Sequence, residues 1–141
     1  MAYNGMCESF FLDLMTAEHD LDTDMLMLAL YEDRNVMHAG LQEYTPVGEC
    51  IGVNYQAGGI EIFTVPGYPK AEDGYAATCR FEELTFVNIS ASIGAALIYN
   101  AKNNRAIRCI DFGGNQLVVT SDFHIKFPAD AEPPVFIKLL R

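Results

Sequence analysis

Basic residues are scarce in this sequence. Nine Lys and Arg stand against nineteen Asp and Glu, which gives a formal net charge of −10. A protein that binds a phosphate backbone needs clustered cations. The nearest approach to a cluster is the pair Arg105 and Arg108, which we interpret as a solvated strand edge. We therefore expect no nucleic-acid partner.

Long apolar runs are also missing. No stretch approaches the roughly 18 apolar residues that read as a membrane-spanning helix, so we expect no membrane partner. The N-terminal segment MAYNGMCESFFLDLM lacks a basic region and carries Glu8 and Asp13, so it does not resemble a signal peptide. We expect a chain that is made in a cytoplasm and works without a membrane anchor.

The four cysteines are too far apart in sequence for a CxxC redox pair or a zinc knuckle. Cys7 and Cys109 lie among apolar residues, and we interpret them as small core side chains. An even number of cysteines permits two disulfides, but we expect reduced thiols because no other feature suggests secretion.

Hydrophobic residues, by contrast, make up half of the 141 residues. This length is enough for one domain with its own core, and we expect a single domain over residues 1–141. A small domain has more surface than interior, so this apolar content predicts a subunit interface and a homo-oligomer.

An N-terminal helix is predicted at about residues 5–17. Apolar side chains recur there at helical spacing, with Asn4 as a plausible N-cap and with Glu8 and Asp13 on the opposite side. The spaced apolar residues are Cys7, Phe10, Phe11 and Leu14.

After this helix, most of the sequence predicts short strands separated by turns. The segment 25–31 is apolar on both faces, which indicates a strand that is covered on both sides. Asn103 and Asn104 suit a hairpin turn, and residues 123–127 alternate between apolar and polar. The pattern predicts a mainly β fold, an antiparallel β-sandwich of jelly-roll type with one N-terminal helix. Further strands are expected within 59–63, 77–89 and 135–140, and an exposed loop at 65–74.

Three aspartates at alternate positions, Asp20, Asp22 and Asp24, invite comparison with a calcium loop. An EF-hand loop that starts at Asp20 needs Gly at its sixth position and Glu at its twelfth. Met25 and Tyr31 occupy those positions, so we interpret the aspartates as a polar turn between the helix and the first long strand.

No catalytic constellation is complete in the sequence. His19, His38 and His124 are scattered, and we expect them at the surface or at an interface. A Gly-x-Ser-x-Gly elbow fails because Ser90 stands where the first glycine should be. The DFGG segment at 111–114 lacks the other kinase motifs and is interpreted as a strand that ends in a glycine turn. We therefore expect neither enzymatic activity nor a metal or cofactor.

Four ordered segments resemble a family of small virion proteins from tailed bacteriophages and prophages. They are SFFLDLMTAEHDLDTDMLMLALYED, EYTPVGECIGVNYQAGG, ISASIGAALIYNAKNNRAIRCIDFGG and FHIKFPADAEPPVFIKLLR. The resemblance spans nearly the whole chain and rests on the ordered set. The insert TVPGYPKAEDGY departs from the family pattern, in which a plainer strand is usual.

The resemblance implies a structural component of a virion without enzymatic activity. The leading expectation is a capsid decoration or cement protein on the outer capsid surface, which binds the major capsid protein and self-associates. A neck, tail or fibre-base component is the alternative, and a module that binds host glycans is a third hypothesis. The expected contact residues are Phe10, Phe11, Leu14, Tyr68, Val135, Ile137 and Leu139.

Overall fold

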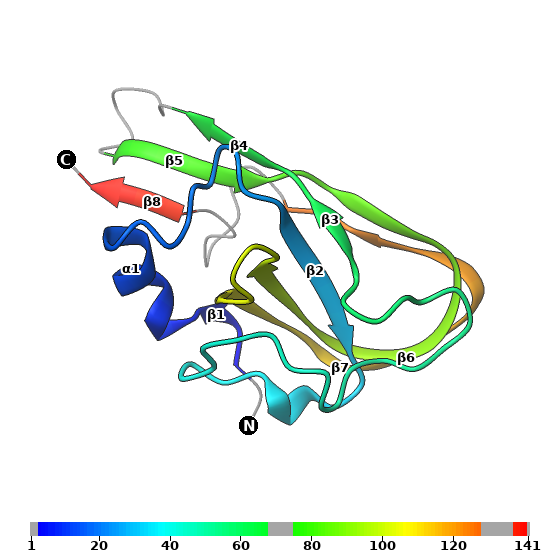
Figure 1. The fold of residues 1–141 in the computed structure, drawn as a ribbon. Coiled ribbons are helices and arrows are strands. Elements are labelled where there is room, and N and C mark those ends of the chain that lie inside the picture. Colours follow the sequence, from blue (N-terminus) through cyan, green and yellow to red (C-terminus); the bar gives the residue numbers. More distant parts are fainter. Residues whose placement is uncertain (1–2, 68–74, 128–136, 141) are drawn as a thin grey trace.

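The computed structural model describes residues 3–67, 75–127 and 137–140 (Figure 1). Strands dominate this part of the chain, and its one α-helix lies near the N-terminus. The elements, in chain order, are β1 (Gly5–Met6), α1 (Glu8–Met15), β2 (Leu26–Tyr31), a 3₁₀ turn η1 (Arg34–Val36), β3 (Ile60–Ile62), β4 (Thr64–Gly67), β5 (Tyr75–Phe81), β6 (Leu84–Asn100), β7 (Ala106–Ile125) and β8 (Ile137–Leu140).

The strands form two antiparallel sheets. The larger has the order β1-β7-β6-β2-β3, and the smaller has the order β4-β5-β8. Only Phe63 separates β3 from β4, and only Glu82 and Glu83 separate β5 from β6, so the chain passes almost directly from one sheet to the other. Phe81 of the smaller sheet and Phe86 of the larger one belong to the same hydrophobic core. The prediction of a mainly β, antiparallel fold with an N-terminal helix is confirmed, whereas the sandwich and its jelly-roll arrangement stay predictions.

Strand β2 is buried on both faces, as its uninterrupted apolar sequence predicts. Its three leucines, Leu26, Leu28 and Leu30, share a core with Phe10 of α1. Ala29 and Tyr31 belong to a second buried cluster on the other face, where Met37 and Tyr44 cover them. One face of β2 therefore lies in the core to which Phe10 belongs, and the segment that follows β2 covers the other face.

Helix α1 is shorter than the predicted span of about 5–17. Gly5 and Met6 pair with Cys109 and Arg108 of β7, and this pairing keeps their backbone extended. The helix therefore begins at Glu8, with Cys7 at the N-cap position, and Asn4 does not cap it. Ala17, with φ of 62°, follows the end of the helix at Met15.

Strands β6 and β7 form a long hairpin that dominates the larger sheet. The predicted asparagine turn is confirmed, with Asn104 in the left-handed region at φ of 62°. The interpretation of DFGG as the end of a strand is wrong, because β7 continues through Gly113 at φ of 83° with shifts in its register. The expected strand at 77–89 is two strands, and Asn88, with φ of 52°, lies at an irregularity in the second.

The predicted alternation near the end of β7 is confirmed. Ile125 is buried, and Phe123 and Phe127 pack partly against the same core. His124 and Lys126 are exposed between them. The predicted loop at 65–74 is partly wrong, since its first residues belong to β4, and positions 68–74 lie outside the described residues.

Candidate functional site: buried polar clusters and exposed apolar surfaces

A buried carboxylate, Glu49, is held by three hydrogen-bond donors. The Tyr44 hydroxyl donates to Oε1 over 2.5 Å, and the Tyr55 hydroxyl donates to Oε2 over 2.5 Å. The backbone N–H of Gly58 donates to Oε2 over 2.7 Å. Only 8% of Glu49 is exposed. We call these four residues the Glu49 cluster.

The Glu49 cluster fixes a long loop onto the larger sheet. The Tyr99 hydroxyl of β6 donates to the Gly58 carbonyl over 2.7 Å, and its ring stacks on Tyr44 with 4.6 Å between centroids. Leu30 of β2 donates its backbone N–H to the Tyr55 hydroxyl over 2.9 Å. Burial, followed by the hydrogen bond to Glu49, raises the pKa of Tyr44 and of Tyr55, so both hydroxyls stay protonated donors. This arrangement suits a structural tie, and sequence reasoning missed it because all its members lie in loops without periodicity.

His19 is buried, so the expectation of a surface or interface position is wrong for this histidine. Its ring stacks on Phe10 with 5.4 Å between centroids, and its Nδ1 lies 3.1 Å from the Asn100 side-chain nitrogen. Burial lowers the pKa of His19 despite the carboxylates of Asp13 and Asp24 nearby. His38 and His124 are exposed, as expected.

The carboxylates beside His19 are each bound to a cation. Arg105 donates to both oxygens of Asp13 over 2.9 and 3.3 Å, and Lys102 lies 3.1 Å from Asp24. Asp13 is therefore buried, although the sequence places it opposite the apolar side chains of the helix. Arg105 is bound to Asp13 and is not the solvated side chain that the sequence indicates. His19 Nε2 lies 3.9 Å from Asp13, which is too long for a hydrogen bond. This geometry favours a structural ion-pair network over proton transfer.

The aspartate run forms the polar turn that the sequence indicates. One Asp20 oxygen accepts the backbone N–H groups of Asp22 and Thr23, and Asp24 accepts that of Asp20 over 2.8 Å. A hydrogen bond from the Thr23 side chain, followed by these backbone bonds, lowers the pKa of Asp20, and the bond from the Asp20 N–H lowers the pKa of Asp24. In residues 3–67, 75–127 and 137–140, no three His, Cys, Asp or Glu side chains converge on a possible metal ion.

All four cysteines are buried and unpaired. The Sγ atoms of Cys7 and Cys109 lie 3.7 Å apart between the start of α1 and β7. Arg108 lies in the same region with only 3% exposure, so the interpretation of this arginine as solvated is wrong. Burial lowers the pKa of its guanidinium.

Helix α1 carries an exposed apolar face. Its residues Phe11, Leu12 and Met15 are 55, 60 and 79% exposed, and their spacing places them on one side of the helix. We call them the α1 patch. Two neighbouring predicted contact residues point elsewhere: Phe10 is fully buried, which corrects its assignment to an interface, and Leu14 packs partly against the core.

The other predicted contact residues lie at position 68 and between positions 135 and 139. Tyr68 and Val135 are outside the described residues. Ile137 and Leu139 lie on β8, where they pair with Cys79 and Ala77 of β5. For these four positions, the structure therefore describes only the backbone pairing of Ile137 and Leu139.

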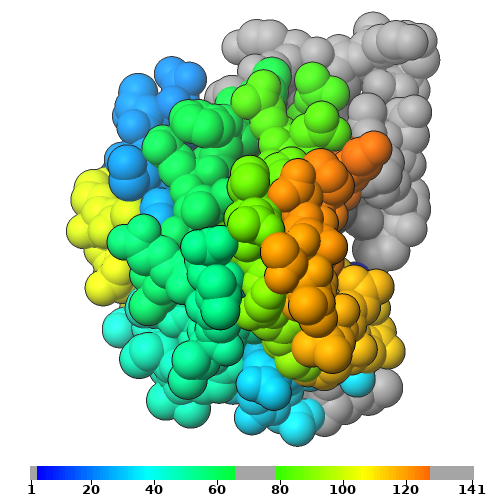
Figure 2. Space-filling view, turned by 90° about the vertical axis from the view of Figure 1, so that its right-hand side faces the viewer, coloured from blue at the N-terminus to red at the C-terminus, as the bar shows by residue number. Residues whose placement is uncertain are grey.

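A second apolar surface covers the sheet on the side away from α1. Figure 2 shows this face, where the loop after residue 50, the start of β6 and the end of β7 lie side by side. Ser90 of β6 bridges Val53 on one side, and Ser92 pairs with Leu117 of β7 on the other. We call the exposed apolar residues here the sheet patch: Ile51, Val53, Val87, Leu117 and Val119.

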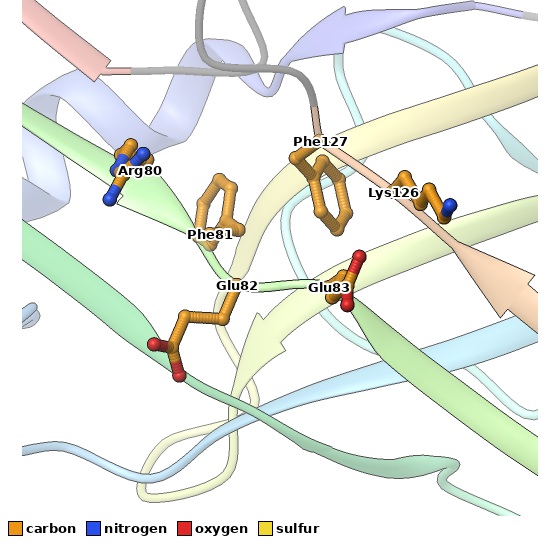
Figure 3. Close-up of a pocket in the computed structure, with 6 residues that line it drawn as sticks. All are labelled: Arg80, Phe81, Glu82, Glu83, Lys126 and Phe127. Atoms are coloured by element: carbon orange, nitrogen blue, oxygen red, sulfur yellow. The ribbon is translucent and has the colours of Figure 1, made fainter.

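A hollow of about 450 Å³ lies where β5 and β7 end (Figure 3). Phe81 and Phe127 face each other in it, with 5.7 Å between ring centroids. Its other lining residues are two cations and two carboxylates, namely Arg80, Lys126, Glu82 and Glu83. The hollow therefore carries no excess of either charge and contains neither a histidine nor a cysteine.

Comparisons with known proteins identify no relative of this chain. No protein-family model matches the chain, and no curated protein or solved structure matches it either. Among the described residues, no helix has the length and apolar character needed to cross a membrane.

Proposed function

We propose that this chain is a non-enzymatic structural protein of a tailed-bacteriophage virion, a decoration or cement protein that binds the major capsid protein lattice. The ordered resemblance of four segments to small virion proteins supports this function. The net charge of −10 suits the outer capsid surface, away from packaged DNA. Cement acts through many repeated contacts, so a modest affinity at each position is enough to stabilise a shell.

The observation that carries the proposal is the α1 patch. Three large apolar side chains project from a helix of eight residues, and each is more than half exposed. Water contact with such a cluster is unfavourable, and clustered exposed apolar groups mark sites of protein association. We assign the α1 patch as the surface that contacts the capsid protein.

The polar clusters support a structural role over catalysis. The Glu49 carboxylate accepts hydrogen bonds from three donors, and the Asp13 carboxylate accepts hydrogen bonds from Arg105. A general acid or base must reach a substrate proton, and both groups are buried and already bound within the fold. Their geometry stabilises the loops that surround the sheets.

Quantitative mass spectrometry of purified particles tests the proposal. A cement protein is expected at a copy number comparable to that of the major capsid protein. A copy number that fits a single ring would instead support a neck or tail component, and absence from the particles would contradict both.

The α1 patch is tested by adding the purified chain to capsids that lack it. Met15→Lys places a charge in the patch and is expected to weaken capsid binding at least about tenfold, or about 1.4 kcal/mol. Ile51→Lys is the matched control, because Ile51 is 94% exposed and lies in the loop that follows Cys50, not on α1. Equal binding by both variants and the unmodified chain would rule out the α1 patch.

A further inference from the structure

Two buried cysteines, Cys7 and Cys109, are in sulfur contact where the N-terminal segment meets β7. Their Sγ atoms lie 3.7 Å apart, and both side chains are fully buried. The other two cysteines have different neighbours: Cys50 donates to the Ser92 carbonyl over 3.2 Å, and Cys79 packs in the larger core. Among the described residues, which include all four cysteines, only Cys7 and Cys109 therefore form a sulfur pair.

The backbone beside each of the two cysteines is already fixed against the other strand. Gly5 of β1 pairs with Cys109, and the Cys7 N–H donates to the Ile107 carbonyl over 2.9 Å. To form a disulfide, the sulfurs must move from 3.7 Å to about 2.0 Å apart. Rotation of a cysteine side chain between its staggered positions moves the sulfur further than this. The bond can therefore form while the pairing of β1 with β7 is kept.

We propose that Cys7 and Cys109 form a redox-sensitive clasp, a dithiol that closes to a disulfide in an oxidising medium and ties the start of α1 to β7. In the reduced chain, β1 holds this segment on β7 through the pairing of two residues, Gly5 and Met6. The two cysteines are 102 positions apart. A bond between such distant positions restricts the unfolded chain strongly, so it stabilises the oxidised fold.

The reaction needs an external oxidant, and a small-molecule disulfide such as oxidised glutathione supplies it. The Cys109 thiolate attacks one sulfur of this molecule, which breaks its S–S bond and releases one thiol. The Cys7 thiolate then attacks the Cys109 sulfur of the mixed disulfide and releases the second thiol. The cysteines lose two electrons and two protons, which reduce the oxidant to two thiols. The hydrogen bond with Cys7 lowers the pKa of Cys109, and the charge of Arg108 acts in the same direction, so Cys109 is the first nucleophile.

A thin cover separates the sulfur pair from solvent. The His38 carbonyl lies 3.7 Å from the Cys109 sulfur, while His38 itself is exposed. The Glu8 N–H donates to the Ala39 carbonyl over 2.9 Å and holds this cover against the start of α1. Local opening of the cover admits the oxidant without unfolding of the sheets.

The timing of the oxidation rests on the proposed function, whereas the bond itself does not. Thiols stay reduced in a cytoplasm, and disulfides form in an extracellular medium. A virion protein therefore assembles with the clasp open and closes it after release from the cell. The closed clasp fixes the start of α1, and with it the α1 patch, on β7.

Oxidation of the purified full chain with oxidised glutathione tests the clasp. Peptide mapping without reductant is expected to find a disulfide between Cys7 and Cys109 of the same chain. The oxidised chain should melt at least about 6 °C above the same sample treated with dithiothreitol. No linkage, a different linkage, or a melting temperature that the reductant leaves unchanged would overturn the proposal.

Two variants supply the matched comparison. Cys109→Ala should abolish the difference in melting temperature between oxidised and reduced samples, and Cys79→Ala should keep it. Each variant is compared with itself, so a loss of stability caused by the substitution cancels. A difference that persists in Cys109→Ala would show that another bond causes it and would overturn the clasp.

Alkylation of free thiols in infected cells and in released particles tests the timing. The clasp is expected to be open in the first sample and closed in the second. The same redox state in both would overturn the timing, and absence of the chain from the particles would contradict the proposed function. The result with the purified chain stands apart from both outcomes.

Discussion

Replacing Glu49 by alanine should remove a large fraction of the stability of this fold. The substitution leaves three donors without their acceptor: the hydroxyls of Tyr44 and Tyr55 and the N–H of Gly58. These groups join the loop to β2 and β6, so the loss is expected to affect the unfolding of the whole chain.

The magnitude follows from the number and kind of the bonds. A hydrogen bond to a charged group contributes roughly 1.5–3 kcal/mol, so three give about 4–9 kcal/mol before compensation. Water that enters the space left by the carboxylate recovers part of this, as does the Leu30 carbonyl at 3.5 Å from the Tyr55 hydroxyl. We expect Glu49→Ala to lower the free energy of unfolding by about 3–5 kcal/mol, a large share of the 5–15 kcal/mol typical of a domain.

Urea unfolding followed by tyrosine fluorescence and circular dichroism measures this loss. The chain has seven tyrosines and no tryptophan, so the fluorescence reports the tyrosines alone. Glu43→Ala is the matched control, because the Glu43 side chain is 64% exposed and lies 3.6 Å from Arg105. An exposed pair of this kind contributes less than about 1 kcal/mol. If Glu49→Ala loses no more stability than Glu43→Ala, the structural role of the Glu49 cluster is refuted.

Three further predictions concern His19, the cysteine pair and Gly59. Burial holds the pKa of His19 below its ordinary 6.5, so the unfolded chain binds this proton more readily than the folded chain. The free energy of unfolding should therefore fall as the pH drops below about 6.5. His19→Gln should flatten this part of the curve of stability against pH, and an unchanged curve would contradict the burial of His19. A disulfide oxidant should link Cys7 to Cys109 before any other native pair, because their sulfur atoms lie 3.7 Å apart. Peptide mapping that finds another linkage first would contradict this placement of the two cysteines. Gly59→Ala should lower the free energy of unfolding by more than about 3 kcal/mol. Gly59 has a φ of 82°, and a Cβ added there would meet the Leu28 carbonyl oxygen of β2 at 1.8 Å. Gly114→Ala is the control and should change the free energy of unfolding far less, because a Cβ added there meets nothing within 4 Å.

Local patterns predicted the parts of the fold that depend on local forces. The apolar run of β2 indicated burial on both faces, and Asn104 marked the hairpin turn. The alternation from Phe123 to Phe127 placed the apolar side chains inward. Each of these features follows from hydrophobic periodicity or from turn chemistry within a few residues.

The errors arose where a distant partner decides the environment. The sequence places Asp13 opposite the apolar side chains of the helix, but Arg105, which is 92 positions away, makes its burial favourable. His19 is buried because Phe10 and Asn100 enclose it. Gly113 lies in a register shift of β7, and the strand continues because its pairing with β6 resumes at Gln116. Such long-range terms are absent from any local window of the sequence.

A density map of phage particles from the genome that encodes this chain tests the proposed capsid contact most directly. We expect density for the chain on the outer face of the capsid, with Phe11, Leu12 and Met15 of α1 against the major capsid protein. A map that shows the chain with its α1 patch facing solvent, or a particle without the chain, would overturn the proposed capsid contact.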